Sequence, residues 1–339
     1  MTSLDDLRRS YPLMNGWEAP TLFQETTSVN GLRIHLVGLA ARATDSEMAI
    51  GSAGALECAP LARAYFELLE RASIVTSMRD PTASVVLKDA HGAQRSIVTV
   101  AELFPASTAP QSWSYSRSNG VAIASNWKDA CDRALWELIE RDRVLRSWYG
   151  AIVPEKIDFP AGFLPPHLSE IYDVEAFSFG AANALDVQVV AVFGFPRVEG
   201  APLIGGLGAR PTAQGALEAA WGECLQRLGF LWGEEVPSDE PAFAATPDFH
   251  QETFLWPGKH ATLRAWLSGA HSRFDGCLKE PISTARGSRL FADLTPAVLE
   301  GRAVVAKAIA QSEVPLTFGC GHPLVERASP EELRVHPVA

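Results

Sequence analysis

The sequence lacks the short cysteine and histidine motifs that mark zinc sites and disulfide frameworks. None of its eight histidines has another four residues away, and its five cysteines include no Cys-x-x-Cys pair; they are Cys58, Cys131, Cys224, Cys277 and Cys320. Scattered thiols of this kind are typical of a reduced, cytoplasmic protein. We therefore expect neither a disulfide framework nor a metal site built from cysteine or histidine.

Long apolar segments and an excess of positive charge are also missing. No apolar run approaches the roughly 20 residues that span a membrane, and the charged first 30 residues do not resemble a signal peptide. The net charge of -11 argues against a nucleic acid or an anionic membrane as partner. With 339 residues, 47% hydrophobic and 20% charged, the chain fits a globular protein with a large core.

One phrase is present twice, and a looser copy follows. Residues 63–71 and 133–141 both read Arg-Ala-x-aromatic-Glu-Leu-aliphatic-Glu-Arg, and residues 220–227 read Ala-Trp-Gly-Glu-Cys-Leu-Gln-Arg. In a helix, residues three and four apart share a face. The intervening positions are apolar or small and suit a core. Each copy therefore projects one polar set: Glu67, Glu70 and Arg71; Glu137, Glu140 and Arg141; Glu223, Gln226 and Arg227.

A single copy would be explained by a solvated helix face with an i,i+4 ion pair. Three copies favour a shared site. Carboxylates brought together repel one another and tend to protonate unless cations neutralise them. Magnesium prefers oxygen ligands and commonly brings phosphates with it. The residues therefore predict a magnesium–nucleotide site lined by helix faces.

Apolar periodicity predicts alternating strands and helices. We expect strands at 32–39, 47–52, 84–87, 174–178 and 187–195, and helices at 57–76, 126–148, 212–232 and 252–267, the last broken near Pro257. Residues 104–118 and 233–251 have loop composition. Residues 205–210 are rich in glycine, which predicts a turn, with a phosphate-binding loop as the alternative. His322 and His336 are expected to be surface or packing residues. The alternation implies an α/β or α+β fold.

Four segments, in order, resemble the motifs of the YcaO family. The first is Gly51-Ser-Ala-Gly54 followed by the helix ending Glu67-Leu-Leu-Glu70-Arg71. The second runs from Ser118-Asn119-Gly120 to Glu137-Leu-Ile-Glu140-Arg141-Asp142, and the third is Glu223-Cys-Leu-Gln226. The fourth is Phe291-Ala-Asp-Leu-Thr-Pro296 with the apolar run 304–309. Together they cover residues 45 to 325.

This resemblance implies a fold and a domain plan. The fold would be α/β (α+β), with two pseudo-repeated α/β halves whose motif helices line an ATP–magnesium site. An N-terminal arm would occupy residues 1–30, the YcaO domain residues 31–330, and a C-terminal tail residues 331–339. Members of the family are often homodimers, so a homodimer is expected.

The resemblance also implies an activity: ATP- and Mg2+-dependent O-phosphorylation of a peptide backbone amide, giving an azoline, a thioamide or an amidine in ribosomal peptide natural-product biosynthesis. The nucleotide would be bound by Glu67, Glu70, Arg71, Ser118, Asn119, Glu137, Glu140, Arg141, Glu223 and Gln226. The carboxylates expected on magnesium are Glu67, Glu70, Glu137 and Glu140.

The sequence departs from the family pattern in two places. Many members carry Gly-Lys-Gly where this chain has Ser52-Ala53-Gly54, so Arg63 or Lys88 would have to supply a phosphate contact. Azoline-forming members often end in Pro-x-Pro-x-Pro, whereas residues 336–339 contain one proline, which favours a thioamide or an amidine.

No added leader-peptide domain is recognised. A separate leader-binding E1-like or TfuA-like partner and a precursor peptide substrate are therefore expected. Two alternatives remain. In the first, the chain is a non-catalytic YcaO-like scaffold in a peptide-modification complex. In the second, it is a different magnesium-dependent ATP enzyme.

Overall fold

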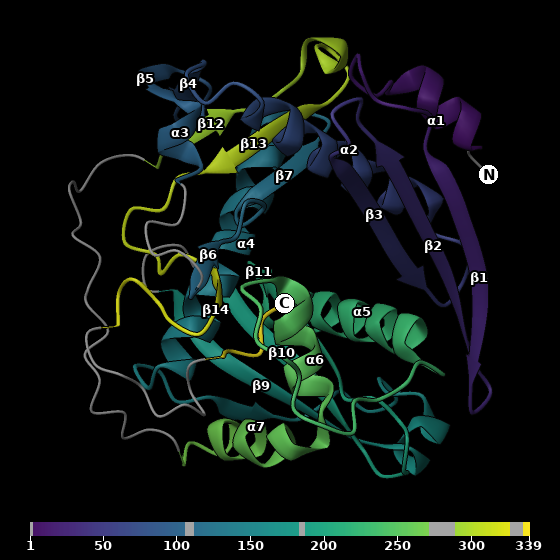
Figure 1. The fold of residues 1–339 in the computed structure, drawn as a ribbon. Helices are drawn as coiled ribbons and strands as arrows, with labels where there is room; N and C mark the ends of the chain where they lie inside the picture. Colours follow the sequence, from purple (N-terminus) through teal and green to yellow (C-terminus); the bar gives the residue numbers. More distant parts are fainter. Residues whose placement is uncertain (1–2, 106–111, 183–186, 271–288, 326–334) are drawn as a thin grey trace.

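A computed structural model describes residues 3–105, 112–182, 187–270, 289–325 and 335–339. Cys277 and the expected domain boundary at residue 330 lie outside the described residues. In the N-terminal layer, α1 (Leu4–Ser10) is followed by an antiparallel sheet of β1 (Thr21–Val29), β2 (Leu32–Arg42) and β3 (Met48–Ala55) (Figure 1). Strand β1 pairs with β2 along its whole length, so residues 21–29 pack into this sheet.

A five-stranded sheet forms the second layer, in the order β5-β4-β12-β13-β7. Its strands are β4 (Ser84–Lys88), β5 (Gln94–Thr99), β7 (Val121–Ala124), β12 (Phe291–Asp293) and β13 (Val304–Ala308). The short helix α3 (Val100–Leu103) follows β5. Segments far apart in the chain therefore share one sheet, because β12 pairs with β4 and β13 pairs with β7.

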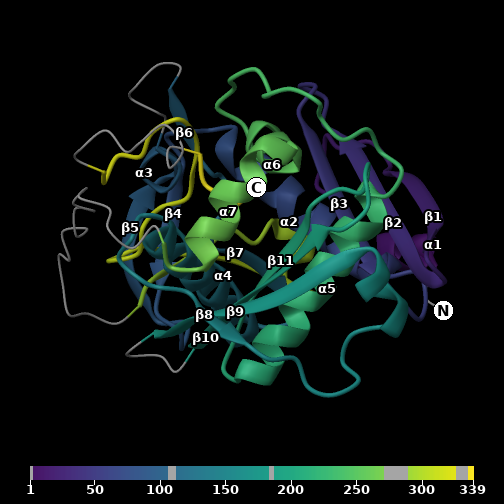
Figure 2. The same cartoon turned by 90° about the horizontal axis from the view of Figure 1, so that it is seen from below.

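The third layer is a four-stranded sheet in the order β11-β10-β9-β8. It contains β8 (Glu155–Ile157), β9 (Tyr172–Ala182), β10 (Val187–Pro196) and β11 (Ile204–Arg210). Beside it lie α6 (Pro247–Leu255) and α7 (His260–Leu267), separated by a short 3-10 turn at Pro257–Lys259 (Figure 2). This turn confirms the predicted break near Pro257. A two-stranded ribbon of β6 (Trp113–Tyr115) and β14 (Thr317–Gly319) completes the strands.

Three long helices carry the three copies of the repeated phrase. They are α2 (Leu61–Met78), α4 (Trp127–Trp148) and α5 (Ala213–Leu231), each close to its predicted range. Asn126 caps α4 by accepting the Asp129 N–H, and Thr212 caps α5 by accepting the Gly215 N–H. The apolar residues of each phrase are buried in the core, which confirms the predicted mixed helix and sheet architecture.

The glycine-rich segment at 205–210 is part of strand β11, so both the predicted turn and its phosphate-loop alternative are wrong. The glycines are required by packing. A Cβ atom at Gly206 would lie 2.2 Å from the Ala220 carbonyl oxygen on α5. In the same way, a Cβ at Gly51 in β3 would lie 2.1 Å from the Ala64 carbonyl oxygen on α2. Glycine allows each strand to approach its helix this closely.

Both predicted loops are partly wrong. Residues 104–118 include strand β6, and helix α6 begins at Pro247 inside the predicted 233–251 loop, with Thr246 as its N-cap. His322 and His336 are buried packing residues, 7% and 1% exposed. Cys58, Cys131 and Cys224 are free thiols. None of the helices in the described part of the chain combines the length and apolar character that a membrane crossing requires.

Candidate functional site

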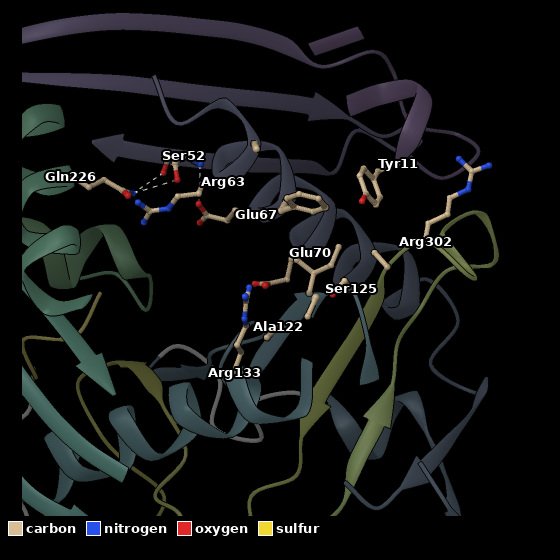
Figure 3. A pocket seen from close by; sticks show the side chains of 15 residues that line it. Tyr11, Ser52, Arg63, Glu67, Glu70, Ala122, Ser125, Arg133, Gln226 and Arg302 are labelled. Carbon is tan, nitrogen blue, oxygen red and sulfur yellow. Dashed lines mark hydrogen bonds between the residues drawn. The ribbon is translucent and has the colours of Figure 1, made fainter. Parts of the chain in front are cut away.

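A cavity of about 530 Å³ opens beside α2, α4 and strand β7. Side chains from several segments that are far apart in the sequence reach it (Figure 3). Polar lining residues are Tyr11, Ser52, Arg63, Glu67, Glu70, Ser125, Arg133, Gln226 and Arg302. We call this space the first cavity. Its volume suits a small-molecule ligand such as a nucleotide.

The first acidic residue of each repeat is held by a backbone N–H of the strand that packs against its helix. Glu67 accepts the Ser52 N–H at 2.9 Å, and Glu223 accepts the Leu207 N–H at 3.0 Å. Glu137 accepts a backbone hydrogen bond from Gly120. The repetition in sequence is therefore a repetition in structure, in which a strand edge fixes a carboxylate at the same point of each helix.

Gln226 joins the third helix to the first sheet. Its Oε1 accepts the Gly54 N–H at 3.3 Å, and its Nε2 donates to the Ser52 hydroxyl at 3.3 Å. Figure 3 shows Gln226 meeting Ser52 at the edge of the first cavity. The segment that replaces the family's Gly-Lys-Gly loop is therefore part of β3 and is held there by α5.

Of the other acidic residues, Glu140 is buried, and Glu70 and Glu137 are partly buried. Burial raises the pKa of Glu70 to about 8, opposed by Arg71 and reinforced by the charges of Glu137 and Glu67. Burial likewise raises the pKa of Glu140 to about 7, opposed by Arg141 and reinforced by Glu223 and Glu137. The pKa of Glu137 is also raised, chiefly by burial. Glu137 thus lies at the electrostatic centre, since it acts on both Glu70 and Glu140.

Arginines surround these carboxylates without fully neutralising them. Arg71 lies 3.5 Å from Glu67, and Arg141 lies 3.3 Å from Glu140. Each is a single contact that is longer than an optimal ion pair. The free-energy cost of burying the other carboxylates is therefore not offset. Such a cluster gains stability when a cation enters it.

These donors fit Mg2+ by chemical type, because carboxylate oxygens are the ligands that this ion prefers. In the described ranges, however, no three His, Cys, Asp or Glu side chains come together as a ready-made metal site. The carboxylates share one buried region, and their ligation of magnesium stays a prediction.

The predicted nucleotide-binding residues do not all line one cavity: Arg141 and Glu223 line a small one together with Pro337, Val338 and Ala339. Glu67, Glu70 and Gln226 line the first cavity, and Arg63 does so too, as the sequence suggested. Lys88 instead forms an ion pair with Asp293 at 2.6 Å. Asn119 lines a different cavity, described below, and the Ser118 carbonyl closes the turn into β7 by accepting the Val121 N–H.

Sequence reasoning missed Ser125 and Arg133 as lining residues. Arg133 occupies the same position in the second repeat that Arg63 occupies in the first, and Figure 3 shows both reaching into the first cavity from α4 and α2. Comparison of the two copies would have identified it. Ser125 has no such signal, because it lies just past β7 and enters the cavity only through the placement of that strand.

Solved structures share this fold. The YcaO protein from Methanopyrus kandleri bound with AMPPCP and Mg2+ matches with a TM-score of 0.59 and 15% identity over 90% of this chain and 86% of that one. The E. coli microcin synthetase McbBCD complex with pro-MccB17 bound contains a chain that matches with a TM-score of 0.60 and 12% identity, over 94% and 96%. A heterocyclase in complex with substrate and cofactor gives 0.55 and 14%, over 91% of this chain but 51% of that longer one.

These likenesses show that the chain shares its fold with these proteins. The model of the YcaO family, described as YcaO cyclodehydratase, ATP- and Mg2+-binding, matches residues 93–300, more than half of the 339-residue chain. The chain belongs to the YcaO family. Its cofactors are accordingly ATP and Mg2+. No curated protein matches the sequence.

Proposed function

We propose that this protein is an ATP- and Mg2+-dependent enzyme that activates a backbone amide of a ribosomally made precursor peptide. The observation that carries the proposal is the set of buried carboxylates, supplied by three repeated helices, beside a cavity of about 530 Å³. Buried acidic groups that repel one another are costly to the fold, and they are typical of functional sites. The ATP and Mg2+ bound by the family would offset this cost, because a bound cation neutralises the carboxylates.

Each group has a proposed part in binding. The residues proposed for the nucleotide are those predicted from the sequence apart from Asn119, which lines a different cavity, with Arg63 and Arg133 as phosphate contacts in place of the missing lysine. Glu67, Glu70, Glu137 and Glu140 are proposed to hold magnesium. The protein's task is then positioning and charge neutralisation.

In the proposed reaction, a nucleophile bonds to the amide carbon, the amide oxygen takes the terminal phosphoryl group of ATP, and phosphate later departs with that oxygen. A cysteine, serine or threonine of the peptide would give an azoline, and an external sulfide would give a thioamide.

We further propose that the enzyme works in the cytoplasm as a homodimer with a separate partner, a leader-binding E1-like or TfuA-like protein. Support comes from the E. coli microcin synthetase McbBCD complex, in which a chain of this fold is found together with pro-MccB17. The scaffold alternative predicts instead that the chain binds the partner but not the nucleotide.

Calorimetric titration of ATP with Mg2+ tests the proposal. The wild type should bind, and Glu70→Gln and Glu137→Gln should each weaken binding at least tenfold, because each keeps the side-chain shape but removes a charge. Glu218→Gln is the matched control, since Glu218 is exposed on α5 and pairs only with Gln214. Absence of binding by the folded wild type would favour the scaffold. Equal binding by all variants would refute the assigned site.

A further inference from the structure

A second cavity, of about 550 Å³, lies at the far end of α2 from the first. Its walls come from the end of α2, helix α3, strand β13 and the residues flanking β6 and β14. Most of the lining is apolar, from Met78, Leu103, Phe104, Ile309 and Leu316. Nothing in the proposed nucleotide chemistry accounts for a space of this size and character.

Lys307 is the unusual residue in this wall. It is only 9% exposed, yet no carboxylate among the described residues lies within 4.0 Å of its ammonium. Its Nζ donates to the Asn119 carbonyl oxygen at 2.8 Å and lies 5.2 Å from the centre of the Phe104 ring. An ammonium carries three donors, and one acceptor leaves most of that capacity unused. Burial lowers its pKa to about 8, opposed by the charge of Glu137.

Asn119 supplies the complementary group. It is 7% exposed, and within the described chain its side-chain Oδ1 is buried with no hydrogen-bond donor. A buried acceptor without a partner is uncommon in folded proteins and calls for a ligand or water. Since the carbonyl of the same residue receives the Lys307 ammonium, the cavity wall offers a donor and an acceptor side by side.

We propose that the second cavity binds the substrate peptide as an extended, apolar segment, with one backbone carbonyl accepting from Lys307 and one backbone N–H donating to Asn119 Oδ1. A peptide unit carries this one donor and one acceptor, and the apolar wall accommodates the side chains beside it. The inference rests on the proposed function and deepens it by locating the second reactant.

The position of Glu137 is consistent with this arrangement. It acts electrostatically on Glu70, which lines the first cavity, and on Lys307, which lines the second. Glu137 therefore couples a residue of one cavity to a residue of the other, although it is not among the lining residues of either. An ammonium at the peptide oxygen also suits a reaction in which negative charge develops on that oxygen.

Ligand-detected NMR with a defined probe tests the inference. The probe is N-acetyl-leucyl-phenylalanyl-leucine methylamide, together with an analogue in which the central amide N–H is replaced by an ester oxygen. The wild type should bind the peptide. Lys307→Met should weaken it at least tenfold, and Lys128→Met, an exposed lysine on α4, should leave it unchanged. The ester should bind the wild type more weakly than the amide, but Asn119→Ala should bind both equally.

Phe104→Ala provides a second variant if Lys307→Met does not fold, since it keeps the lysine but removes the part of the apolar wall that faces the ammonium, and it should also weaken peptide binding. No binding by the wild type, or equal binding by Lys307→Met, would overturn the inference. The same samples are titrated with AMPPCP and Mg2+. If the protein binds the peptide through Lys307 but binds no nucleotide, the peptide site stands and the proposed function is rejected. If it binds the nucleotide but not the peptide, the peptide site is rejected and the proposed function stands.

Discussion

The two cavities are nearly equal in volume, about 530 and 550 Å³, but differ in their charged groups. The first gathers several acidic and basic side chains from repeated helices, whereas the second combines an apolar wall with the buried Lys307 ammonium and with Glu102 and Arg117. Clustered carboxylates are suited to a cation and its phosphates, and sparse polar groups in an apolar wall are suited to orienting an organic segment. The difference is consistent with the proposal that one fold holds the nucleotide and the peptide in separate cavities.

The largest expected effect concerns the strand behind the first cavity. Gly51→Ala would place a Cβ 2.1 Å from the Ala64 carbonyl oxygen, so β3 and α2 must separate. We expect a loss of about 3 kcal/mol in the free energy of unfolding, as for severe overpacking. Gly222→Ala on α5 is the control, because nothing lies within 4 Å of the added atom. It should stabilise the helix by up to about 1 kcal/mol. Urea unfolding measures both, and a harmless Gly51→Ala would contradict the close contact.

A smaller effect is expected from the ionisation of Glu70, which lines the first cavity. The pKa of Glu70 is raised from 4.5 to about 8, so the folded state disfavours its ionised form. The resulting cost appears as pH rises above 4.5 and is complete above 8. Glu70→Gln removes this cost and should stabilise the metal-free protein by about 2 kcal/mol at pH 8.5 and hardly at all at pH 4.5. Urea midpoints in the presence of EDTA provide the measurement. An equal gain at both pH values would rule out a titrating carboxylate.

The second cavity should show the opposite pH dependence. The pKa of Lys307 is lowered from 10.5 to about 8, so the folded state disfavours the ammonium. That cost is fully present below pH 8 and disappears as pH rises towards 10.5. Lys307→Met should therefore stabilise the protein by about 1–2 kcal/mol at pH 7 and progressively less above pH 8. Thermal unfolding across this range checks the trend, with Lys128→Met as a control that should leave the midpoint nearly unchanged. A gain that grows with pH would contradict the sign.

The smallest expected effect concerns His250, a buried histidine that lies outside both cavities. His250 accepts the Gly319 N–H at 2.7 Å and hydrogen-bonds the His336 carbonyl at 2.9 Å, so it is held neutral. Burial lowers its pKa to about 4, so stability falls as pH drops from about 6.5 towards 4. His250→Gln should reduce the slope of that fall by up to about 1.4 kcal/mol per pH unit. His91→Gln, at an exposed position, should keep the wild-type slope in acid unfolding series. An unchanged slope in His250→Gln would exclude this histidine as the titrating group.

Much of the first cavity could be predicted from the sequence because its residues belong to repeated helices. Helical spacing brings Glu67 near Glu70 and Glu137 near Glu140 without reference to the rest of the fold. Three copies of one phrase also indicated a shared site. The helix ranges were close for the same reason, since a period of 3.6 over many residues is a strong signal.

No such pattern in the sequence indicates the second cavity. Lys307 sits in an apolar strand, and Phe104 is nearly 200 residues earlier. They meet only because β13 pairs with β7 and α3 closes the same end of the sheet. Asn119 was predicted beside the nucleotide, but the turn ahead of β7 places it in the second cavity.

The sequence by itself determined the three motif helices and the acidic set, because these follow from local periodicity and repeated residues, and its motifs carried the resemblance to the YcaO family. Only the tertiary structure decided that the glycines of residues 205–208 form a strand, that Arg133 reaches the first cavity and that Lys307 is buried without an acid. Each of those outcomes depends on contacts between segments far apart in the chain. Close strand–helix packing and burial are properties of the assembled layers, and no local pattern encodes them.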